Sequence, residues 1–277
     1  MNRLILLTLS LFFVGISYSS AQIVDENYEI EQQLLASTKQ LNQFFRRFNG
    51  EEDTKGKKFE PDDRQYRNDR LRKKYLSILF DQEDTDISSN DKEAFVNAVT
   101  SETNPVFLNL QSKDWFAVVN TTFLYKGRET PLTLYMKIQA EGLGYEWVIS
   151  DIAFDPYKTI FDKQRGETKE FLHPMSHELD FMNLRKALVK GGSPESYTLA
   201  DYEPDYLTLF LYEVKMGTLQ FQTVNRMNFH FFGINNWYFS LTNFNRPSDN
   251  SGWLISDLLQ INASQKEDLL KIIYDKK

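Results

Sequence analysis

The sequence contains no cysteine, only three histidines and few residues that break regular structure, with 12 glycines and 8 prolines among 277 residues. The absence of cysteine excludes disulfide bonds, thiolate nucleophiles, zinc ribbons and iron–sulfur clusters. Three histidines leave little material for a histidine-built metal site. The low glycine and proline content excludes collagen-like and low-complexity classes. In contrast, 22 phenylalanines, 14 tyrosines and 4 tryptophans favour aromatic-rich strands around a buried core.

Long apolar runs are also scarce, and the one that stands out is at the N-terminus. Arg3 precedes an apolar stretch from Leu4 to Ile16, and small polar residues follow it as far as Ala21. This pattern predicts a secretory signal peptide over residues 1–21. The stretch is short for a membrane span, which needs about 20 apolar residues, so a retained anchor is the less favoured alternative. We therefore expect an exported protein, periplasmic or secreted, with no membrane span after cleavage.

Positive charge is in short supply as well. The formal net charge is -7, and removing residues 1–21, whose only charged side chain is Arg3, changes it from -7 to -8. An acidic chain without a basic excess is a poor binder of nucleic acid. A cysteine-free exported chain is more typical of a bacterium than of extracellular animal proteins, whose small domains rely on disulfides. We therefore expect a bacterial protein without a nucleic-acid partner.

Two stretches of the chain repeat each other at a separation of 106 residues. The sequence FLYKG at Phe123–Gly127 matches FHFFG at Phe229–Gly233, and WVISD at Trp147–Asp151 matches WLISD at Trp253–Asp257. One gapless register connects both pairs. Self-similarity at a fixed period indicates repeated structure, so the sequence predicts an internal duplication.

Strand patterns follow one another within each copy without helices between them. Alternating or aromatic-rich segments bounded by turn residues predict three strands in each copy. In the first copy these are Trp115–Tyr125, Pro131–Gln139 and Tyr145–Phe154, with turns at 126–128 and 141–144. In the second copy they are Thr218–Phe232, Asn235–Phe244 and Ser251–Ile261, with turns at Gly233 and at 246–252. Each copy therefore predicts an antiparallel meander.

Helical periodicity precedes each meander rather than alternating with its strands. The predicted helices are Tyr28–Phe48, Asn68–Phe80 and Asp91–Thr100 before the first meander, and Ser176–Lys190 and Pro204–Met216 before the second. A capping box formed by Ser264 and Glu267 opens a final helix. This order favours an α+β fold with a curved antiparallel sheet packed on helices over a parallel doubly wound sheet.

This arrangement resembles the cystatin-like α+β fold of the NTF2-like superfamily, which is defined by architecture and has no obligatory motif. The resemblance covers 28–154 and 176–261. It implies two tandem domains, at 25–160 and 161–265, each with helices followed by a curved antiparallel sheet. The capping box of Ser264 and Glu267 adds a C-terminal helix at 266–277. In family members the resulting half-open cone hosts isomerase or dehydratase active sites, small-molecule binding sites or protein interfaces. The fold alone does not choose among these uses.

Asp151 and Asp257, which end the equivalent third strands, are the candidate catalytic acids. The resemblance implies a cone carboxylate with a raised pKa that acts as a general base, as in isomerases of this fold class. The alternative is that each Ser-Asp pair closes its strand through local hydrogen bonds. Its presence in both copies favours this structural alternative, because catalysis usually survives in only one copy of a duplicated domain.

His173 and His177 are the candidate metal ligands, because they are four residues apart and stand beside Glu178. However, Pro174 predicts that a helix starts between them, so the two rings need not share a face. A third ligand is also missing. A structural role at the start of the helix is therefore favoured over metal binding.

Trp237, Tyr238 and Phe239 are the candidate surface for a ligand or partner. Core packing is the default for aromatic residues on strands. Three consecutive rings must nevertheless point to both sides of their strand. We therefore expect the rings of the second copy to pack the two meanders on one another or on their helices.

Motifs that identify an enzyme are missing from the chain. It has no nucleophile elbow with a Ser-His-Asp order, no dinucleotide or phosphate loop and no calcium loop, and it predicts no cofactor. We therefore expect a non-enzymatic binding or scaffolding protein, whose partner is a protein or a small apolar ligand. The alternatives are a cone-type isomerase, dehydratase or hydrolase with a carboxylate general base, and a structural component of an envelope assembly.

Overall fold

The structure is a computed structural model, and it describes residues 41–83, 86–142, 144–160, 188, 194–199, 201–247 and 250–275. Several predicted features lie outside these residues. They are the signal peptide at 1–21, the first part of the Tyr28–Phe48 helix, nearly all of the Ser176–Lys190 helix, and the histidines His173 and His177.

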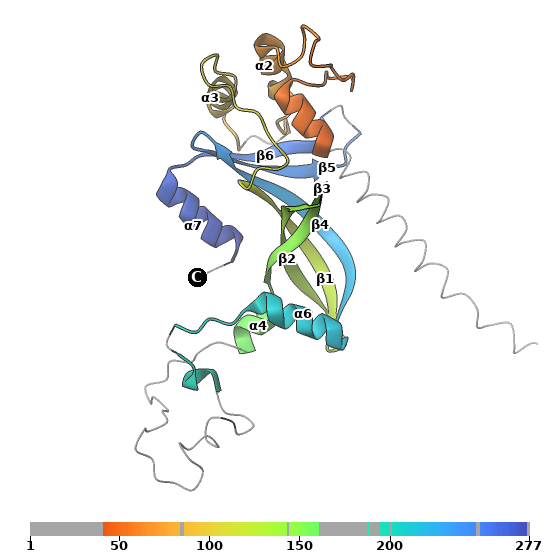
Figure 1. Ribbon diagram of the computed structural model, residues 1–277, viewed down its shortest axis with the longest axis vertical. Helices are drawn as coiled ribbons and strands as arrows, with labels where there is room; N and C mark the ends of the chain where they lie inside the picture. Colours follow the sequence, from red (N-terminus) through yellow and green to blue (C-terminus); the bar gives the residue numbers. More distant parts are fainter. Residues whose placement is uncertain are drawn as a thin grey trace, which may run out of the picture. The chain divides into compact units, whose positions relative to one another are not determined.

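The two predicted meanders are separated by short helices (Figure 1). Residues 41–49 are helical, and α2 (Asp69–Ser77) and α3 (Ser89–Val99) follow. The first meander consists of β1 (Trp115–Tyr125), β2 (Arg128–Glu141) and β3 (Gly144–Ala153). Next come α4 (Asp155–Ile160), the 3-10 helix η1 (Pro194–Tyr197) and α6 (Tyr206–Met216). The second meander consists of β4 (Leu219–Ile234), β5 (Trp237–Phe244) and β6 (Gly252–Gln260), and α7 (Ala263–Ile273) follows it.

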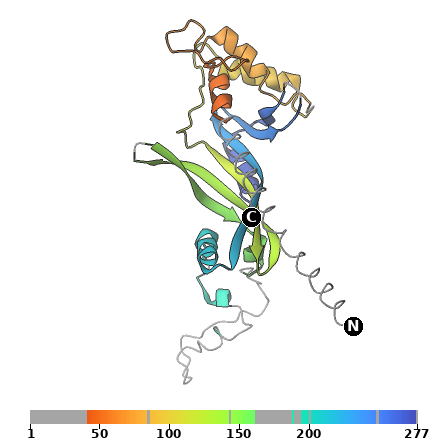
Figure 2. The ribbon, with the colours of Figure 1, turned by 90° about the vertical axis from the view of Figure 1, so that its right-hand side faces the viewer.

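The six strands form one curved antiparallel sheet in the order β3-β2-β1-β4-β5-β6. The predicted α+β class and the two successive three-stranded meanders are confirmed. The β1–β2 turn is at the predicted place, since Lys126 and Gly127 have φ values of 50° and 79° between the paired residues Tyr125 and Arg128. Positive φ at both central residues gives the turn that matches the twist of a hairpin. Figure 2 shows the hairpin of β2 and β3 as a long two-stranded ribbon.

The turn between β4 and β5 differs from the prediction. It is formed by Asn235 and Asn236, with φ values of 35° and 65°, and not by Gly233. Asparagine tolerates this backbone region better than most residues. Gly233 instead lies within β4, where an added Cβ would be 2.7 Å from the Cβ of Asp114. The predicted equivalence of Gly127 and Gly233 is therefore wrong: the first supplies a turn conformation and the second permits a close approach.

The chain divides into two compact units, which combine segments that are distant in sequence. Unit 1 contains residues 1–115 and 228–262, and unit 2 contains residues 116–227 and 263–277. Unit 1 thus joins the helices that precede the first meander to β5, β6 and the end of β4. Unit 2 joins β1, β2 and β3 to α4, α6, α7 and the beginning of β4. The structure therefore does not confirm two tandem domains, each built from its own preceding helices and meander.

A cluster of aromatic rings forms the core of unit 1. Phe239 of β5 is fully buried and stacks on Phe231 of β4, with 4.6 Å between the ring centroids. The same ring meets Phe48 of the helix at 41–49 at 6.1 Å and Phe95 of α3 at 5.7 Å. Trp237 also packs against Phe95, at 5.6 Å. Because aromatic pairs add to the burial of apolar area, this cluster holds the N-terminal helices on the second meander.

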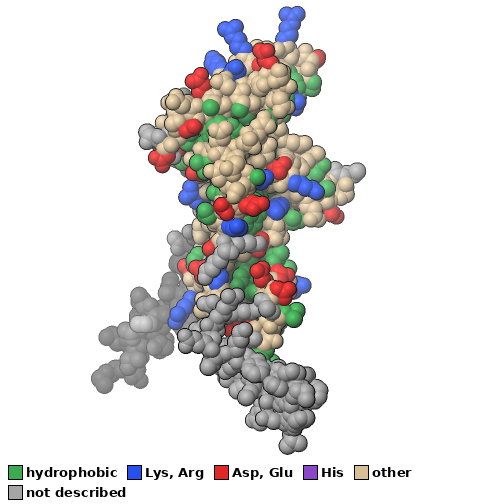
Figure 3. All heavy atoms as spheres, turned by 90° about the vertical axis from the view of Figure 1, so that its left-hand side faces the viewer, with side chains coloured by type: hydrophobic (Ala, Val, Ile, Leu, Met, Phe, Trp, Pro, Cys, Tyr) green, Lys and Arg blue, Asp and Glu red, His purple; other side chains and the backbone are tan. Residues whose placement is uncertain are grey.

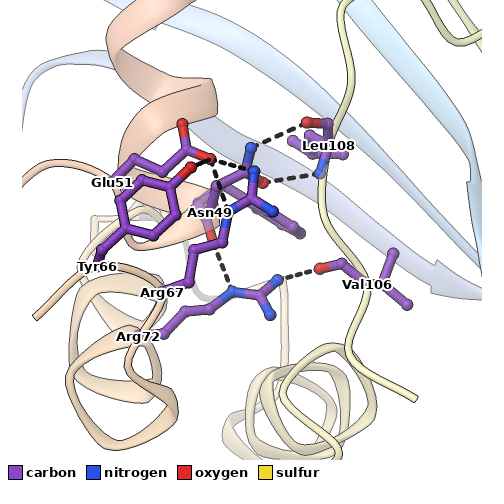
Figure 4. A network of polar contacts seen from close by, with 8 residues as sticks. Asn49, Glu51, Tyr66, Arg67, Arg72, Val106 and Leu108 are labelled. Atoms are coloured by element: carbon purple, nitrogen blue, oxygen red, sulfur yellow. Dashed lines mark hydrogen bonds and ion pairs between the residues drawn. The ribbon is translucent and has the colours of Figure 1, made fainter. Parts of the chain in front are cut away.

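A buried arginine joins three backbone segments of unit 1, and Figure 4 shows its bond to Val106. Arg72 of α2 donates hydrogen bonds to the carbonyl oxygens of Phe48 and Val99, at 2.8 and 3.0 Å, and to that of Val106. Its guanidinium carbon lies 4.4 Å from the centre of the Phe107 ring. Burial lowers the pKa of Arg72 to about 10, so the side chain stays charged at neutral pH. Two of the acceptors are at the C-terminal ends of helices, where a cation is favourable.

The segment that leads from α3 to β1 is held at a second point. The amide of Asn49 donates to the carbonyl of Leu108 at 2.9 Å and accepts from its N–H at 2.8 Å (Figure 4). Nearby, Arg67 forms an ion pair with Glu51 at 2.6 Å. The two bonds of Asn49 anchor the segment, and Trp115 at the start of β1 stacks on Phe231 of the aromatic cluster.

The outer edge of β6 is covered by the segment after α2. Phe80 forms a parallel bridge with Ile255, and the backbone bonds Ile255 N to Leu79 O and Asp81 N to Ile255 O measure 2.8 and 3.0 Å. Arg246, which follows β5, binds both carboxylate oxygens of Asp81, at 2.7 and 3.0 Å. A bidentate pair of this kind fixes geometry as well as charge.

Unit 2 has a smaller aromatic core. Phe123 of β1 makes edge contacts with Phe210 of α6 at 5.7 Å and with Phe221 of β4 at 5.5 Å. On β2, Tyr135 stacks on Tyr274, which follows α7, at 4.4 Å. Unit 2 thus packs α6 on β1, and the C-terminal segment on β2, through rings that are distant in sequence.

Candidate functional site

The repeated Ser-Asp pair lies at a β-bulge in the first meander. The pairing of β2 with β3 shifts between Tyr135 and Met136, which leaves Ser150 as the extra residue before Asp151. The Ser150 hydroxyl donates to the carbonyl of Tyr135 at 3.0 Å, and Asp151 accepts from the N–H of Ile152 at 2.9 Å. A bulge disrupts the ladder locally, so these side chains bond to backbone groups next to the irregularity.

The second meander has its bulge at the matching place. The pairing of β5 with β6 shifts between Ser240 and Leu241, which leaves Ser256 as the extra residue before Asp257. The hydroxyl of Ser240 donates to the carboxylate of Asp257 and lies 2.9 Å from the hydroxyl of Ser256. Ser256 also lies 2.9 Å from the hydroxyl of Thr242. The carboxylate of Asp257 is therefore bonded to neighbouring hydroxyls.

A histidine extends this group of hydroxyls along the sheet. The Nδ1 atom of His230 lies 2.8 Å from the hydroxyl of Tyr238. Burial lowers the pKa of His230 to about 4, against the opposing effect of the Asp257 charge, and burial raises the pKa of Tyr238. Both side chains are therefore neutral at pH 7. We call the connected residues the polar row: His230, Tyr238, Ser240, Thr242, Ser256 and Asp257.

The polar row does not have the geometry of a nucleophilic triad. In such a site the histidine binds the nucleophilic hydroxyl and a third group orients the histidine. Here the Nδ1 of His230 faces a tyrosine hydroxyl, and Ser240 bonds to Asp257 and Ser256. The arrangement pairs buried polar groups with one another, as buried polar groups require. It therefore supports the structural alternative for the Ser-Asp pair of the second meander.

The candidate surface residues of β5 are all buried, and they point to both sides of the strand as expected. Trp237 and Phe239 face the aromatic cluster with Phe95. Tyr238 faces the other side, where it meets His230 and, at 4.9 Å between centroids, Phe232. In this structure the three rings pack the second meander on the N-terminal helices and on β4.

The candidate metal ligands His173 and His177 lie outside the described residues. Within the described residues, no group of three or more histidine, aspartate or glutamate side chains is placed to hold a metal ion.

An exposed apolar surface on unit 2 was not predicted from the sequence. Of the residues of α6, only Phe210 is buried. The α6 face, as we call this surface, consists of large apolar side chains of α6 that are 40% to 61% exposed: Leu211, Tyr212, Val214 and Met216. A helix that is apolar on all sides is normally covered on all sides, and a contiguous exposed apolar patch marks an interaction site. The apolar residues all around α6 were the signal for it in the sequence.

Charged side chains form no extended field of one sign in the view of Figure 3, where Lys and Arg are interspersed with Asp and Glu. Among the described residues, no helix combines the length and the apolar character needed to cross a bilayer.

Comparison of the chain with family models, with curated proteins and with solved structures finds no match.

Proposed function

We propose that this protein is a non-enzymatic binding or scaffolding protein, exported to the bacterial periplasm or secreted, which recognises a protein through the α6 face. The observation that carries the proposal is the exposure of Leu211, Tyr212 and Met216 on a helix whose inner side is already packed. Exposing these side chains to water costs free energy that a partner would recover by covering them.

The form of this surface favours a protein over a small molecule as the partner. Small-molecule sites are concave and enclose most of the ligand. The α6 face instead presents side chains on the outside of a helix. Tyrosine and methionine are enriched in protein interfaces.

The polar row supports the non-enzymatic part of the proposal. Its serine, histidine and aspartate side chains bond to other members of the row, and none of these contacts creates a histidine-activated nucleophile. The finer fold assignment, two copies of an NTF2-like unit, belongs to the same proposal. The matching bulges at Ser150 and Ser256 support it, because they give the repeated Ser-Asp pair one structural cause.

Site-specific photo-crosslinking in the native envelope tests the proposal. We expect a photoreactive residue in place of Tyr212 to form adducts with a protein. The same residue in place of Gln139, an exposed polar position of β2, serves as the control and is expected to form none. Equal labelling at both positions, or no adduct at either, would contradict a binding role for the α6 face.

A further inference from the structure

One stripe of α6 carries its charges in a fixed order. Asp205, Thr208, Leu211, Tyr212 and Lys215 are all exposed and follow one another at the spacing that places residues on one side of a helix. The stripe has an acid at the start of the helix, apolar side chains in the middle and a base at the end. Asp205 is the N-cap residue and accepts from the N–H groups of Leu207 and Thr208.

This order is complementary to itself only when reversed. A twofold interface brings the same patch of two copies together, so the patch must match its own rotated image. In an antiparallel pair of α6 helices, Lys215 of each copy meets Asp205 of the other, and the Leu211 side chains meet near the axis. A parallel pair would instead oppose Asp205 to Asp205 and Lys215 to Lys215.

Lys215 is available for such a contact, because the described residues give it no ion pair. Val214 and Met216 lie next to the stripe on the helix surface and would extend the buried apolar area. From the charge order and this apolar border, we infer that the α6 face pairs with the α6 face of a second copy, with the two helices antiparallel. This inference rests on the proposed function and names the partner as the chain itself.

The absence of cysteine makes a disulfide test specific. If Lys215 faces Asp205, the twofold axis crosses the helix pair at the height of residue 210, midway between the two. The two copies of residue 211 are then offset by only about 3 Å along the helices, whereas those of residue 216 are offset by about 18 Å. A disulfide requires α carbons within about 7 Å. In the full chain under oxidising conditions, we therefore expect roughly tenfold more covalent dimer from Leu211→Cys than from the control Met216→Cys.

Sedimentation of the unmodified chain over a range of concentrations measures the association directly. We expect a dimer whose dissociation constant rises about fivefold in Lys215→Glu, because a rim ion pair orients more than it binds. Lys137→Glu, the same charge change at an exposed position of β2, is expected to leave the constant unchanged. Asp205→Asn should raise the constant in the same direction but less than Lys215→Glu, since asparagine preserves the N-cap and removes the charge without reversing it.

Each result separates this inference from the proposed function. A chain that stays monomeric, with no Leu211→Cys dimer, overturns the self-pairing; adducts of the Tyr212 probe with a different protein then leave the binding function standing. A dimer linked through Met216→Cys but not through Leu211→Cys also overturns the antiparallel pairing. A monomer that forms no adduct through the Tyr212 probe contradicts both proposals.

Discussion

The Nδ1 atom of His230 lies 2.8 Å from the hydroxyl oxygen of Tyr238, and both side chains are buried in unit 1. The pKa of this histidine is lowered to about 4, mainly because burial disfavours the charged imidazole. In the unfolded chain the ordinary value of about 6.5 applies. Between these two values the unfolded state takes up a proton that the folded state does not.

This difference predicts acid sensitivity. The contribution of His230 to stability is present above pH 6.5 and is lost as the pH falls toward 4. The loss in the free energy of unfolding is about 2 to 3 kcal/mol near pH 4.5. Urea unfolding of the chain and of His230→Gln, at about pH 7.5 and about pH 4.5, measures the effect. We expect the stability difference between wild type and variant to shrink at the lower pH. A difference that stays constant would show that His230 titrates normally in the folded protein.

The bulge of the second meander is expected to depend on Ser240. Its side chain is fully buried and donates to Asp257. Replacing it with alanine removes a hydrogen bond to a charged group, so Ser240→Ala should lower the free energy of unfolding by about 1.5 to 3 kcal/mol. Ser251→Ala, at an exposed position just before β6, is the matched control and should change little. Equal stability of the two variants in urea would speak against a structural role for the polar row.

Arg72 should be among the most sensitive positions of unit 1. Arg72→Met removes three hydrogen bonds, and of the three acceptors the Val99 carbonyl keeps another backbone donor, the N–H of Val106, so we expect a loss of about 3 kcal/mol or more. Arg72→Lys keeps the charge but cannot reach three separated acceptors with one ammonium group, and should recover only part of this loss. Arg70→Met, two residues before Arg72 at an exposed position of α2, serves as the control. Chemical unfolding that gave the same midpoint for Arg72→Met and Arg70→Met would contradict the bonding in Figure 4.

The aromatic contact between Trp237 and Phe95 is expected to couple α3 to β5. Trp237→Ala should lower the free energy of unfolding by about 3 to 5 kcal/mol, as truncations of buried aromatics do. Tyr145→Ala, at an exposed ring of β3, should have little effect. In a double-mutant cycle, Trp237→Ala and Phe95→Ala should lose less together than the sum of their separate losses. Full additivity would show that the two rings do not contact each other.

Local patterns were sufficient to predict the strands. Alternating side chains with turn residues at each end located all six, and β1 was predicted with its observed bounds, Trp115–Tyr125. The turn at Asn235 was missed because a nearby glycine gave a stronger turn signal, although asparagine also adopts positive φ. Position 233 requires glycine because Asp114 leaves no room there for a side chain. No local sequence pattern indicates a contact between residues so far apart in the chain.

The pairing of helices with meanders could not be predicted in the same way. Phe95 lies in α3, the helix directly before the first meander. The strand residues that its ring contacts, Trp237 and Phe239, nevertheless belong to the second meander. Helical periodicity gives the apolar side of a helix but not its partner. The Ser-Asp pairs were predicted as structural elements, but their bulges become visible only when residues are counted on two paired strands.

The composition of unit 1 has a consequence for the order in which the chain can fold. A ribosome delivers the N-terminal end of a polypeptide first, and Phe48 and Phe95 emerge long before Phe239 exists to receive them. The helices at the beginning must wait for strands made near the end, and such distant contacts form slowly. The aromatic core of unit 1 therefore cannot be completed before β5 has been synthesised.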